Sequence, residues 1–464
     1  MAETPQKVNE QETVSTEKKE IKSALKGSKS SISTTNSSTS SSRIQFRIFV
    51  GSYEHNLLCL SVILDPSNVK EPVFQPIFHF QAHALSIKSM DLAKRYLVTG
   101  SNDEHIRIYD LQKRKELGTL LSHQGTITAL KFSKEATEDS ENAASGRWLI
   151  SGSEDGKIII WRTKDWEIFA TLKGHTDKIN DLSIHPSGRV AISVSQDKTI
   201  RLWNLMTAKK AAVLKIKGKD HLGQSGEFVK WSHNGNHFVV GLHNQVLLYR
   251  TSSAKIAKKF KFKSTLMCID LLKVVDKEWL VIGFGDGSIG FYDFETLLDN
   301  IGEDAEEHEK KVLDNKAEDI EPVFSLRGHT NRIKGITFMQ NKDTQNIPLL
   351  ISVSSDGKIV VWNLSIKDQV AVYDTGERLN CVVCAPESVE KVDTMKRRFA
   401  SLDELKGEEQ LDASESEYET DGEEIKSIMK GPNKKSQKKN KNRNNNNNNN
   451  KKKNKKRKVN VTLE

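Results

Sequence analysis

One set of residue types that could do chemistry recurs along the chain: a histidine, a serine or threonine, an aspartate and an aromatic ring. In residues 174–204 the set is His175, Ser193, Asp197 and Trp203. Serine, histidine and aspartate together form the constellation of a serine hydrolase. The same set recurs at matching positions in three further stretches, as His83, Thr99, Asp103 and Tyr109; His123, Ser151, Asp155 and Trp161; and His329, Ser352, Asp356 and Trp362. An active site is normally single. The repetition therefore indicates a structural network in which indole, hydroxyl, imidazole and carboxylate satisfy one another.

The residues between these positions have the pattern of short β-strands. Polar and apolar residues alternate over residues 181–184, as in a strand with one buried face. Residues 190–194 are largely apolar and β-branched, which favours a buried strand, and residues 199–203 alternate again. Turns at residues 186–188 and 196–198 separate the runs. The run does not offer the spacing of three and four residues that a helix needs.

Copies of this unit follow one another along the middle of the chain. Six of them end at Asp110, Arg162, Asn204, Arg250, Asp293 and Asn363. The two longest intervals coincide with a polar insertion at residues 133–147 and an acidic one at residues 297–321. Repeats of roughly 40–45 residues, each supplying one four-stranded blade, are the signature of WD-repeat propellers. The predicted fold is all-β: a seven-bladed WD-repeat β-propeller over residues 46–386.

The first blade must be built from both ends of this region. Residues 47–62 and 76–80 supply three strands but no innermost one, and residues 378–385 supply a further strand at the other end. Adding the strand 378–385 to the first blade closes the ring. Closure removes a seam that would otherwise expose unpaired strand edges.

The two ends of the chain have a different composition. Residues 1–45 are rich in serine and threonine, and residues 387–464 are first acidic and then rich in lysine and asparagine. We expect both to be disordered, because they cannot bury enough apolar surface to offset chain entropy. The net charge of +9 is a property of the second tail: residues 434–458 hold 13 lysines and arginines and no acid, which leaves −4 for the rest. The charge therefore gives no reason to expect a basic nucleic-acid groove on the propeller.

A basic run near the end of the chain predicts nuclear targeting. Such runs act as nuclear import signals or as non-specific RNA contacts, and the alternative is a solubilising tail. The residues concerned are Lys451, Lys452, Lys453, Lys455, Lys456, Arg457 and Lys458.

An acidic segment, residues 403–424, holds 11 acids and one lysine. It contains Ser414, Ser416 and Thr420, each with glutamate three residues later, which is typical of acidophilic-kinase sites. Phosphorylation there would strengthen attraction to basic partners. The alternative is a solvated acidic tail.

The remaining motifs favour structural roles. The glycine-rich run Gly283–Gly287 does not fit G-x-G-x-x-G, because position 288 is Ser288, and it continues into a strand, so we expect a hairpin turn. Cys381 and Cys384 form a lone C-x-x-C without further ligands at suitable spacing, and in a strand they would face opposite sides. We therefore expect no catalytic residue, metal or cofactor, and the protein is predicted not to be an enzyme.

Composition also bears on the compartment. Four cysteines in 464 residues argue against a disulfide scaffold. The first residues lack the apolar core of a signal peptide, and no apolar run approaches the roughly 20 residues of a membrane span. We expect an intracellular, soluble protein with no membrane attachment.

Longer stretches resemble one family. Four stretches are similar to the p21-activated-kinase-interacting WD-repeat proteins. They are GSYEHNLLCLSV at residues 51–62, the run from QAHALSIKSM at residue 81 to GTITALKF, LISGSEDGKIIIW, and ERLNCVVCA followed by EKVDT. In fungi the corresponding family is the maintenance-of-killer WD-repeat protein. The resemblance covers residues 46–395, and the order of degenerate blades and linking sequences makes it more specific than the WD pattern alone.

The resemblance implies a non-catalytic scaffold of the nucleolus that is required for assembly of the large (60S) ribosomal subunit and for pre-rRNA processing. Its implied partners are precursor particles and a ribosomal-like assembly protein, and the basic tail would strengthen association with rRNA. Animal members are also associated with negative regulation of p21-activated kinase signalling. The alternative function is therefore a signalling regulator that binds and inhibits such a kinase.

Overall fold

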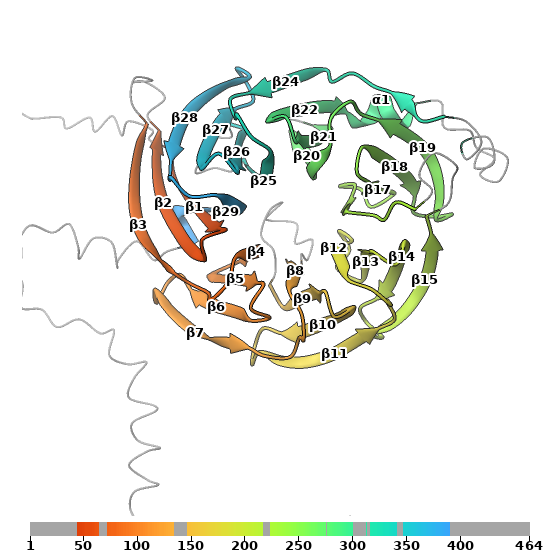
Figure 1. Cartoon of the computed structure of the whole chain (residues 1–464), viewed down its shortest axis with the longest axis horizontal. Coiled ribbons are helices and arrows are strands. Elements are labelled where there is room, and N and C mark those ends of the chain that lie inside the picture. The colour runs from red at the N-terminus through yellow and green to blue at the C-terminus, as the bar shows by residue number, and fades with distance from the viewer. Residues whose placement is uncertain are drawn as a thin grey trace, which may run out of the picture. The chain divides into compact units, whose positions relative to one another are not determined.

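Seven β-sheets stand around a common axis like the blades of a propeller (Figure 1). Six sheets have four strands and one has five, which confirms the predicted seven-bladed fold. The computed structural model describes residues 44–389 apart from 65–71, 134–145, 217–222, 275, 300–311, 313–315 and 341–346. The predicted disordered tails, 1–45 and 387–464, lie almost wholly outside the described residues.

Successive strands within a blade run antiparallel from the axis outward. Blade four shows the pattern with β12 (Ile179–Ile184), β13 (Val190–Ser195), β14 (Thr199–Asn204) and β15 (Lys209–Lys215). Blade two comprises β4 (Ile87–Ala93), β5 (Tyr96–Ser101), β6 (Ile106–Asp110) and β7 (Lys115–Leu120). Blade three comprises β8 (Ile127–Phe132), β9 (Trp148–Ser153), β10 (Lys157–Arg162) and β11 (Glu167–Lys173).

The later blades repeat this order. Blade five comprises β16 (Phe228–Trp231), β17 (His237–Gly241), β18 (Gln245–Arg250) and β19 (Lys255–Lys261). Blade six comprises β20 (Leu266–Val274), β21 (Lys277–Phe284), β22 (Ser288–Asp293) and β24 (Phe324–Arg327). Blade seven comprises β25 (Ile333–Met339), β26 (Leu349–Ser354), β27 (Lys358–Asn363) and β28 (Asp368–Asp374).

Blade one joins the two ends of the folded region. Its order is β29 (Leu379–Pro386), β1 (Ile44–Ser52), β2 (Asn56–Leu64) and β3 (Val73–Gln81), and β29 pairs antiparallel with β1. The sheet begins at Ile44, two residues before the predicted boundary. The innermost strand was predicted at residues 378–385 and lies one residue later.

A buried arginine links the two ends a second time. Arg47 of β1 has 1% of its surface exposed and donates a hydrogen bond to the Ser61 hydroxyl of β2. Its guanidinium also forms an ion pair, 3.0 Å long, with Glu387 in η2 (Glu387–Val389) directly after β29. A buried guanidinium is stable only when it is paired and hydrogen-bonded, so Arg47 favours the closed ring.

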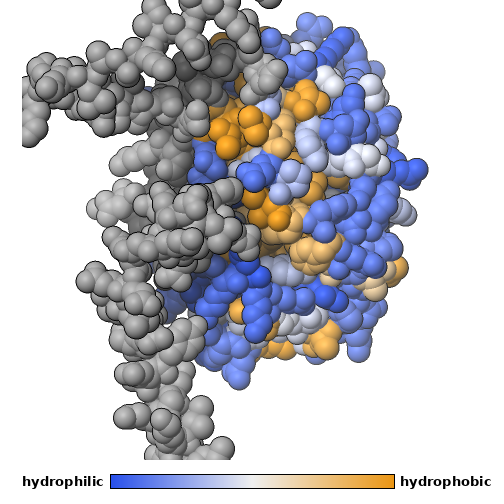
Figure 2. Space-filling model, turned by 90° about the vertical axis from the view of Figure 1, so that its left-hand side faces the viewer, coloured by the Kyte–Doolittle hydropathy of each residue, from blue (hydrophilic) through white to orange (hydrophobic). Residues whose placement is uncertain are grey.

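The apolar core lies between blades rather than inside any one of them. Seven clusters of buried side chains each join two neighbouring blades, and one of them joins blade seven to blade one. In that cluster Phe46 and Ile48 of β1 pack with Ile351 and Val361 of blade seven. The outer strands are more exposed, and Figure 2 shows hydrophobic groups among hydrophilic ones on the side of the ring.

The predicted acidic insertion, residues 297–321, lies between β22 and β24 of blade six, and most of it is outside the described residues. Leu297 lies in a short helix, α1 (Phe294–Leu298), and packs with Phe294 in the core between blades five and six. Asp293 caps α1 by accepting a hydrogen bond from the backbone N–H of Glu295. Farther on, β23 (Glu318–Asp319) pairs in parallel with the outer edge of β19 and makes the fifth strand of blade five. No helix among the described residues has the length and hydropathy to cross a membrane.

Ring closure can be tested by two truncations. Removing residues 379–464 deletes β29 and should lower the midpoint of thermal unfolding strongly, because β1 then loses its partner and Arg47 its counter-ion. Removing only residues 390–464 keeps both and should leave the midpoint within about 2 °C of the full chain. Circular dichroism melts would measure both variants. An unchanged midpoint in the variant without residues 379–464 would contradict the view that closing the ring through β29 stabilises the propeller.

Candidate functional site: the blade networks and the blades that lack them

The structure brings the four predicted residues of blade four together. The indole N–H of Trp203 donates to the Ser193 hydroxyl at 2.8 Å, and His175 Nε2 lies 2.7 Å from the same oxygen. His175 Nδ1 lies 2.9 Å from an Asp197 carboxylate oxygen. The strands β13 and β14, the turn between them and the loop before β12 are thereby joined by one series of hydrogen bonds.

The protonation states follow from burial and partners. Burial lowers the pKa of His175, although Asp197 opposes it, so the imidazole is neutral near pH 7. Burial raises the pKa of Asp197, but hydrogen bonds from Thr199 and His175 outweigh it and bring the pKa to about 2. The neutral ring therefore donates its Nδ1 proton to the carboxylate and accepts the hydroxyl proton of Ser193 at Nε2. Each donor among these four side chains therefore has an acceptor.

Blades three and seven repeat this geometry. The indole–hydroxyl distance is 2.8 Å in both, from Trp161 to Ser151 and from Trp362 to Ser352. The histidine Nε2–hydroxyl distance is also 2.8 Å in both, and the shortest Nδ1–carboxylate distance is 3.2 Å, for His123 with Asp155 and for His329 with Asp356.

Blade two departs from the prediction at its aromatic residue. His83 binds Thr99 at 2.8 Å and Asp103 at 3.0 Å, but the buried hydroxyl of Tyr109 makes no hydrogen bond of normal geometry with the described residues. A phenol carries its hydroxyl at the far end of the ring, whereas an indole carries its N–H on the side. We infer that the phenolic group therefore does not reproduce the indole contact. Burial raises the pKa of Tyr109 to about 12, and Thr99 and Arg107, which lie near the hydroxyl, offset only part of that rise.

The network aspartates also hold the loops at one end of each blade. Asp197 accepts the backbone N–H of Thr176, in the loop before β12, and that of Thr199, the first residue of β14. The glycine before the histidine fits the same packing, because a Cβ at Gly328 would lie 2.7 Å from the Trp362 ring. These contacts fix loop conformation, which is a structural role.

The geometry does not suit nucleophilic catalysis. Ser151, Ser193 and Ser352 have 0% of their surface exposed, and each hydroxyl already contacts an indole and an imidazole. A substrate carbonyl would have no route to such an oxygen. Within the described part of the chain, no group of three His, Cys, Asp or Glu side chains is placed to hold a metal ion.

Two smaller predictions can be placed. Gly287, with φ of +84°, lies in the hairpin turn between β21 and β22, where glycine tolerates the left-handed conformation. Cys381 packs between blades one and two, whereas Cys384 packs between blades seven and one, so the two thiols face opposite sides of β29. Burial raises the pKa of Cys381 to about 12 and that of Cys384 to about 11, which makes both thiols poor ligands.

Charged side chains on the innermost strands were missed by sequence reasoning. Asp91 accepts the backbone N–H of Phe132 from the next blade at 2.6 Å, and Asp181 accepts that of Val229 at 3.0 Å. Lys230 of β16 pairs with Asp270 of β20 at 3.3 Å. These contacts tie neighbouring blades together near the axis. Opposite charges at comparable positions of successive inner strands could have predicted these contacts between blades from the sequence.

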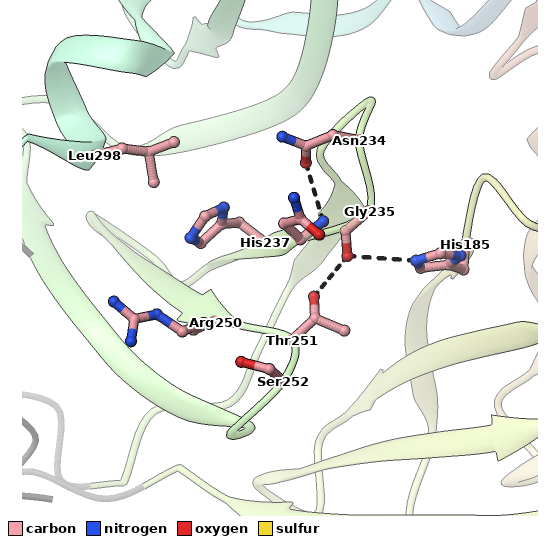
Figure 3. A pocket seen from close by; sticks show the side chains of 9 residues that line it. His185, Asn234, Gly235, His237, Arg250, Thr251, Ser252 and Leu298 are labelled. Carbon is pink, nitrogen blue, oxygen red and sulfur yellow. Dashed lines mark hydrogen bonds between the residues drawn. The ribbon is translucent and has the colours of Figure 1, made fainter. Parts of the chain in front are cut away.

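The degenerate blades leave other features. In blade six Phe262 stands four residues before the innermost strand, where His175 stands in blade four, and Ser264 nearby donates to Asp286 at 2.9 Å. Beside blade five a hollow of about 620 Å³ opens between turns of blades four and five and the end of α1 (Figure 3). It is lined by His185, Asn234, Gly235, Asn236, His237, Arg250, Thr251, Ser252 and Leu298.

The predicted targeting and phosphorylation residues lie outside the described residues. These are Lys451, Lys452, Lys453, Lys455, Lys456, Arg457 and Lys458, together with Ser414, Ser416 and Thr420.

Comparison with known proteins places the chain in a family. The WD domain, G-beta repeat family matches residues 74–110, 114–162, 166–204 and 320–363. Protein MAK11 of Saccharomyces cerevisiae is 52% identical over 410 residues, which cover 85% of this chain and 94% of the relative. The chain belongs to the MAK11 family of WD-repeat propellers.

Other members of the family carry names that refer to kinases. The p21-activated protein kinase-interacting protein 1-like of Gallus gallus is 33% identical over 66% of this chain and 72% of its own length. Shk1 kinase-binding protein 15 of Schizosaccharomyces pombe is 24% identical over 80% of this chain and 95% of its own length. None of the three names describes an enzyme.

Two single-hydroxyl variants test the networks. Ser193→Ala should lower the free energy of unfolding by about 1–3 kcal/mol, because it leaves the indole of Trp203 and the imidazole of His175 buried without their partner. Tyr109→Phe removes a hydroxyl that lies near Thr99 and Arg107 but makes no hydrogen bond of normal geometry with the described residues, so the free energy of unfolding should fall by less than about 1 kcal/mol. Denaturant titrations would compare them. Equal losses in the free energy of unfolding for the two variants would contradict the view that the hydroxyl contributes more in blade four than in blade two.

Acid should weaken the propeller through its buried histidines. The pKa values of His83, His175 and His329 are lowered in the folded chain, so the unfolded chain takes up protons first as the pH falls below about 6.5. The free energy of unfolding should therefore decline from pH 7 to pH 5. His175→Gln should show a shallower decline, and His243→Gln, at an exposed position, the full decline. A flat profile for the native chain would contradict these protonation states.

Proposed function

We propose that this protein is a non-catalytic scaffold of the nucleolus, required for assembly of the large (60S) ribosomal subunit and for pre-rRNA processing. The observation that carries the proposal is the 52% identity to Protein MAK11 along 94% of that relative, together with the family resemblance that implies this role. The propeller supports it, because the candidate catalytic residues are buried in blade networks and binding surfaces remain available on loops and rims.

The expected partners are precursor particles of the large subunit and a ribosomal-like assembly protein. Residues 434–458 would add a second contact, since 13 cationic side chains without an acid attract the phosphate backbone of rRNA. Lys451 to Lys458 would act in nuclear import. In this proposal the propeller supplies specificity for protein and the tail supplies sequence-independent affinity for RNA.

Affinity purification tests the proposal directly. A tagged full-length chain, expressed in Saccharomyces cerevisiae depleted of Protein MAK11, should co-purify with large-subunit precursor RNA and assembly proteins. A variant without residues 434–458 should accumulate less in the nucleus and release RNA at lower salt, while its thermal midpoint stays unchanged. A tagged chain that recovers neither precursor RNA nor assembly proteins would overturn the proposal.

The alternative is a signalling regulator that binds and inhibits a p21-activated kinase. It is favoured by the names of two relatives, a p21-activated protein kinase-interacting protein and a Shk1 kinase-binding protein. Localisation separates the two functions, because this alternative needs no nuclear import. A fluorescent fusion that stays outside the nucleus and recovers such a kinase would favour regulation over ribosome assembly.

A further inference from the structure

The inner strands of six blades share a β-bulge at their beginning. In each, the second residue is skipped in the pairing with the next strand, as Lys88 is skipped between Ile87 and Ser89 of β4. A bulge releases one side chain from the alternation of the strand and re-aims it. The skipped residues are Lys88, Thr128, Asn180, Met267, Lys334 and Asn380. Two of the six are therefore lysines on bulges.

These two lysines lie on either side of blade one. Lys88 belongs to blade two and Lys334 to blade seven, and the inner strand β29 of blade one runs between β4 and β25 (Figure 1). The Asn380 amide of β29 donates to the Ile87 carbonyl of β4 at 2.9 Å, and Gly335 of β25 packs against β29. The lysines are thereby held at the same end of three adjacent inner strands.

A third cation joins them without an acid. Arg332 directly precedes β25 and is exposed. Burial lowers the pKa of Lys334, and the charges of Arg332 and Lys88 lower it further, while the Cys268 thiol opposes them. None of the three cations forms an ion pair with an acid in the described part of the chain. Lys88, Arg332 and Lys334 are therefore a cation triad.

Uncompensated charge is not general among the inner strands. Lys230 of β16 forms an ion pair with Asp270 and also lies near Asp181. In the triad, by contrast, each charge disfavours the others, which costs folding free energy. Departures of this kind, which nothing else in the fold offsets, are expected at functional sites. The triad therefore favours binding of an anionic group.

Two exposed apolar side chains flank the triad. Leu85, in the loop before β4, has 47% of its surface exposed, and Tyr53, in the turn between β1 and β2, has 50%. The backbone N–H of Tyr53 donates to the carbonyl of Arg378 at 2.7 Å, so this turn lies beside the start of β29. Arg378 is exposed too, but the Glu54 carboxylate accepts its backbone N–H and lies nearby. Cations beside apolar side chains suit a ligand with both acidic and apolar groups.

We propose that the cation triad and its two apolar neighbours bind an acidic peptide segment of a partner protein, in which aspartate or glutamate is mixed with apolar residues. Lys88 and Lys334 contact neighbouring carboxylates of the segment from two sides. Arg332 holds a carboxylate through its planar guanidinium, which offers two parallel hydrogen bonds. Leu85 and Tyr53 receive apolar side chains of the segment. This surface does not depend on the ribosomal or the kinase role.

The surface favours an acidic peptide over RNA. Single-stranded RNA is held by a row of cations along its backbone and by aromatic faces on which successive bases stack. Here three cations converge on one place, and of the two apolar neighbours only Tyr53 is aromatic. Leu85 offers no stacking face, whereas it suits an apolar side chain of a peptide.

A photo-crosslinking residue in the full-length chain tests the surface. p-Benzoylphenylalanine replaces Leu85, and the probe is a fluorescent octapeptide of six glutamates and two leucines. Light should couple the probe to position 85, and the coupling should weaken as salt is raised. Lys88→Gln together with Lys334→Gln should reduce the coupled fraction about tenfold. The matched control, Lys198→Gln with Lys263→Gln, removes two exposed lysines from loops of blades four and six and should reduce it less than twofold.

A second variant guards against misfolding. Removing two like charges relieves repulsion, so the thermal midpoint of the Lys88→Gln, Lys334→Gln variant should not fall. Arg332→Glu reverses one exposed charge and keeps both lysines, so it should reproduce the loss of coupling even if the double variant folds poorly. Equal coupling in the lysine variant and its matched control, or in Arg332→Glu and the chain without it, would overturn the proposal.

The remaining arms distinguish the occupants. A probe with glutamine in place of glutamate should couple poorly, and equal coupling would overturn the role of charge. A fluorescent octamer of uridine that couples better than the peptide, in a triad-dependent way, would assign the surface to RNA instead. Coupling of position 85 to residues 403–424 in the absence of probe, mapped by mass spectrometry, would identify the acidic segment of the chain itself as the occupant and overturn a partner protein.

Discussion

A blade cannot bury both of its faces unless it has a neighbour on each side. Each of the seven apolar clusters is shared by two blades, so every sheet depends on the ones beside it. The dependence is circular, and it is satisfied only if blade one is complete. Pairing of β29 with β1, with Arg47 and Glu387 beside it, is therefore the contact on which the remaining interfaces rely.

Much of the fold could be predicted because the repeat constrains it at many levels. Alternating strands, turn residues and the recurring histidine, serine, aspartate and tryptophan all give the same period. Repetition also decided between catalysis and structure for Ser193, since an isolated Ser-His-Asp set would have supported the opposite conclusion. The buried hydroxyls at 0% exposure agree with a structural role.

The features that could not be predicted depend on contacts between repeats or on residues that depart from the repeat pattern. Tyrosine at position 109 keeps the spacing of the repeat, and only geometry shows that its hydroxyl makes no hydrogen bond of normal geometry with the described residues. Lys230 meets Asp270 across a blade boundary, 40 residues along the chain. Leu297 lies at the start of the acidic insertion, and its neighbours along the chain did not indicate that it packs in the core. The hollow beside blade five is formed by turns of two blades and a helix, and no single stretch encodes it.

Construction of blade one from distant segments sets an order of events during synthesis. β1, β2 and β3 are complete by Gln81, but β29 begins only at Leu379. At about 5–20 residues per second, a ribosome needs roughly 15–60 s to make the intervening chain. For that time the inner edge of β1 is an unpaired strand beside growing sheets of similar sequence. Blades that form early must therefore avoid this edge, or a molecular chaperone must cover it, until Leu379–Pro386 arrives.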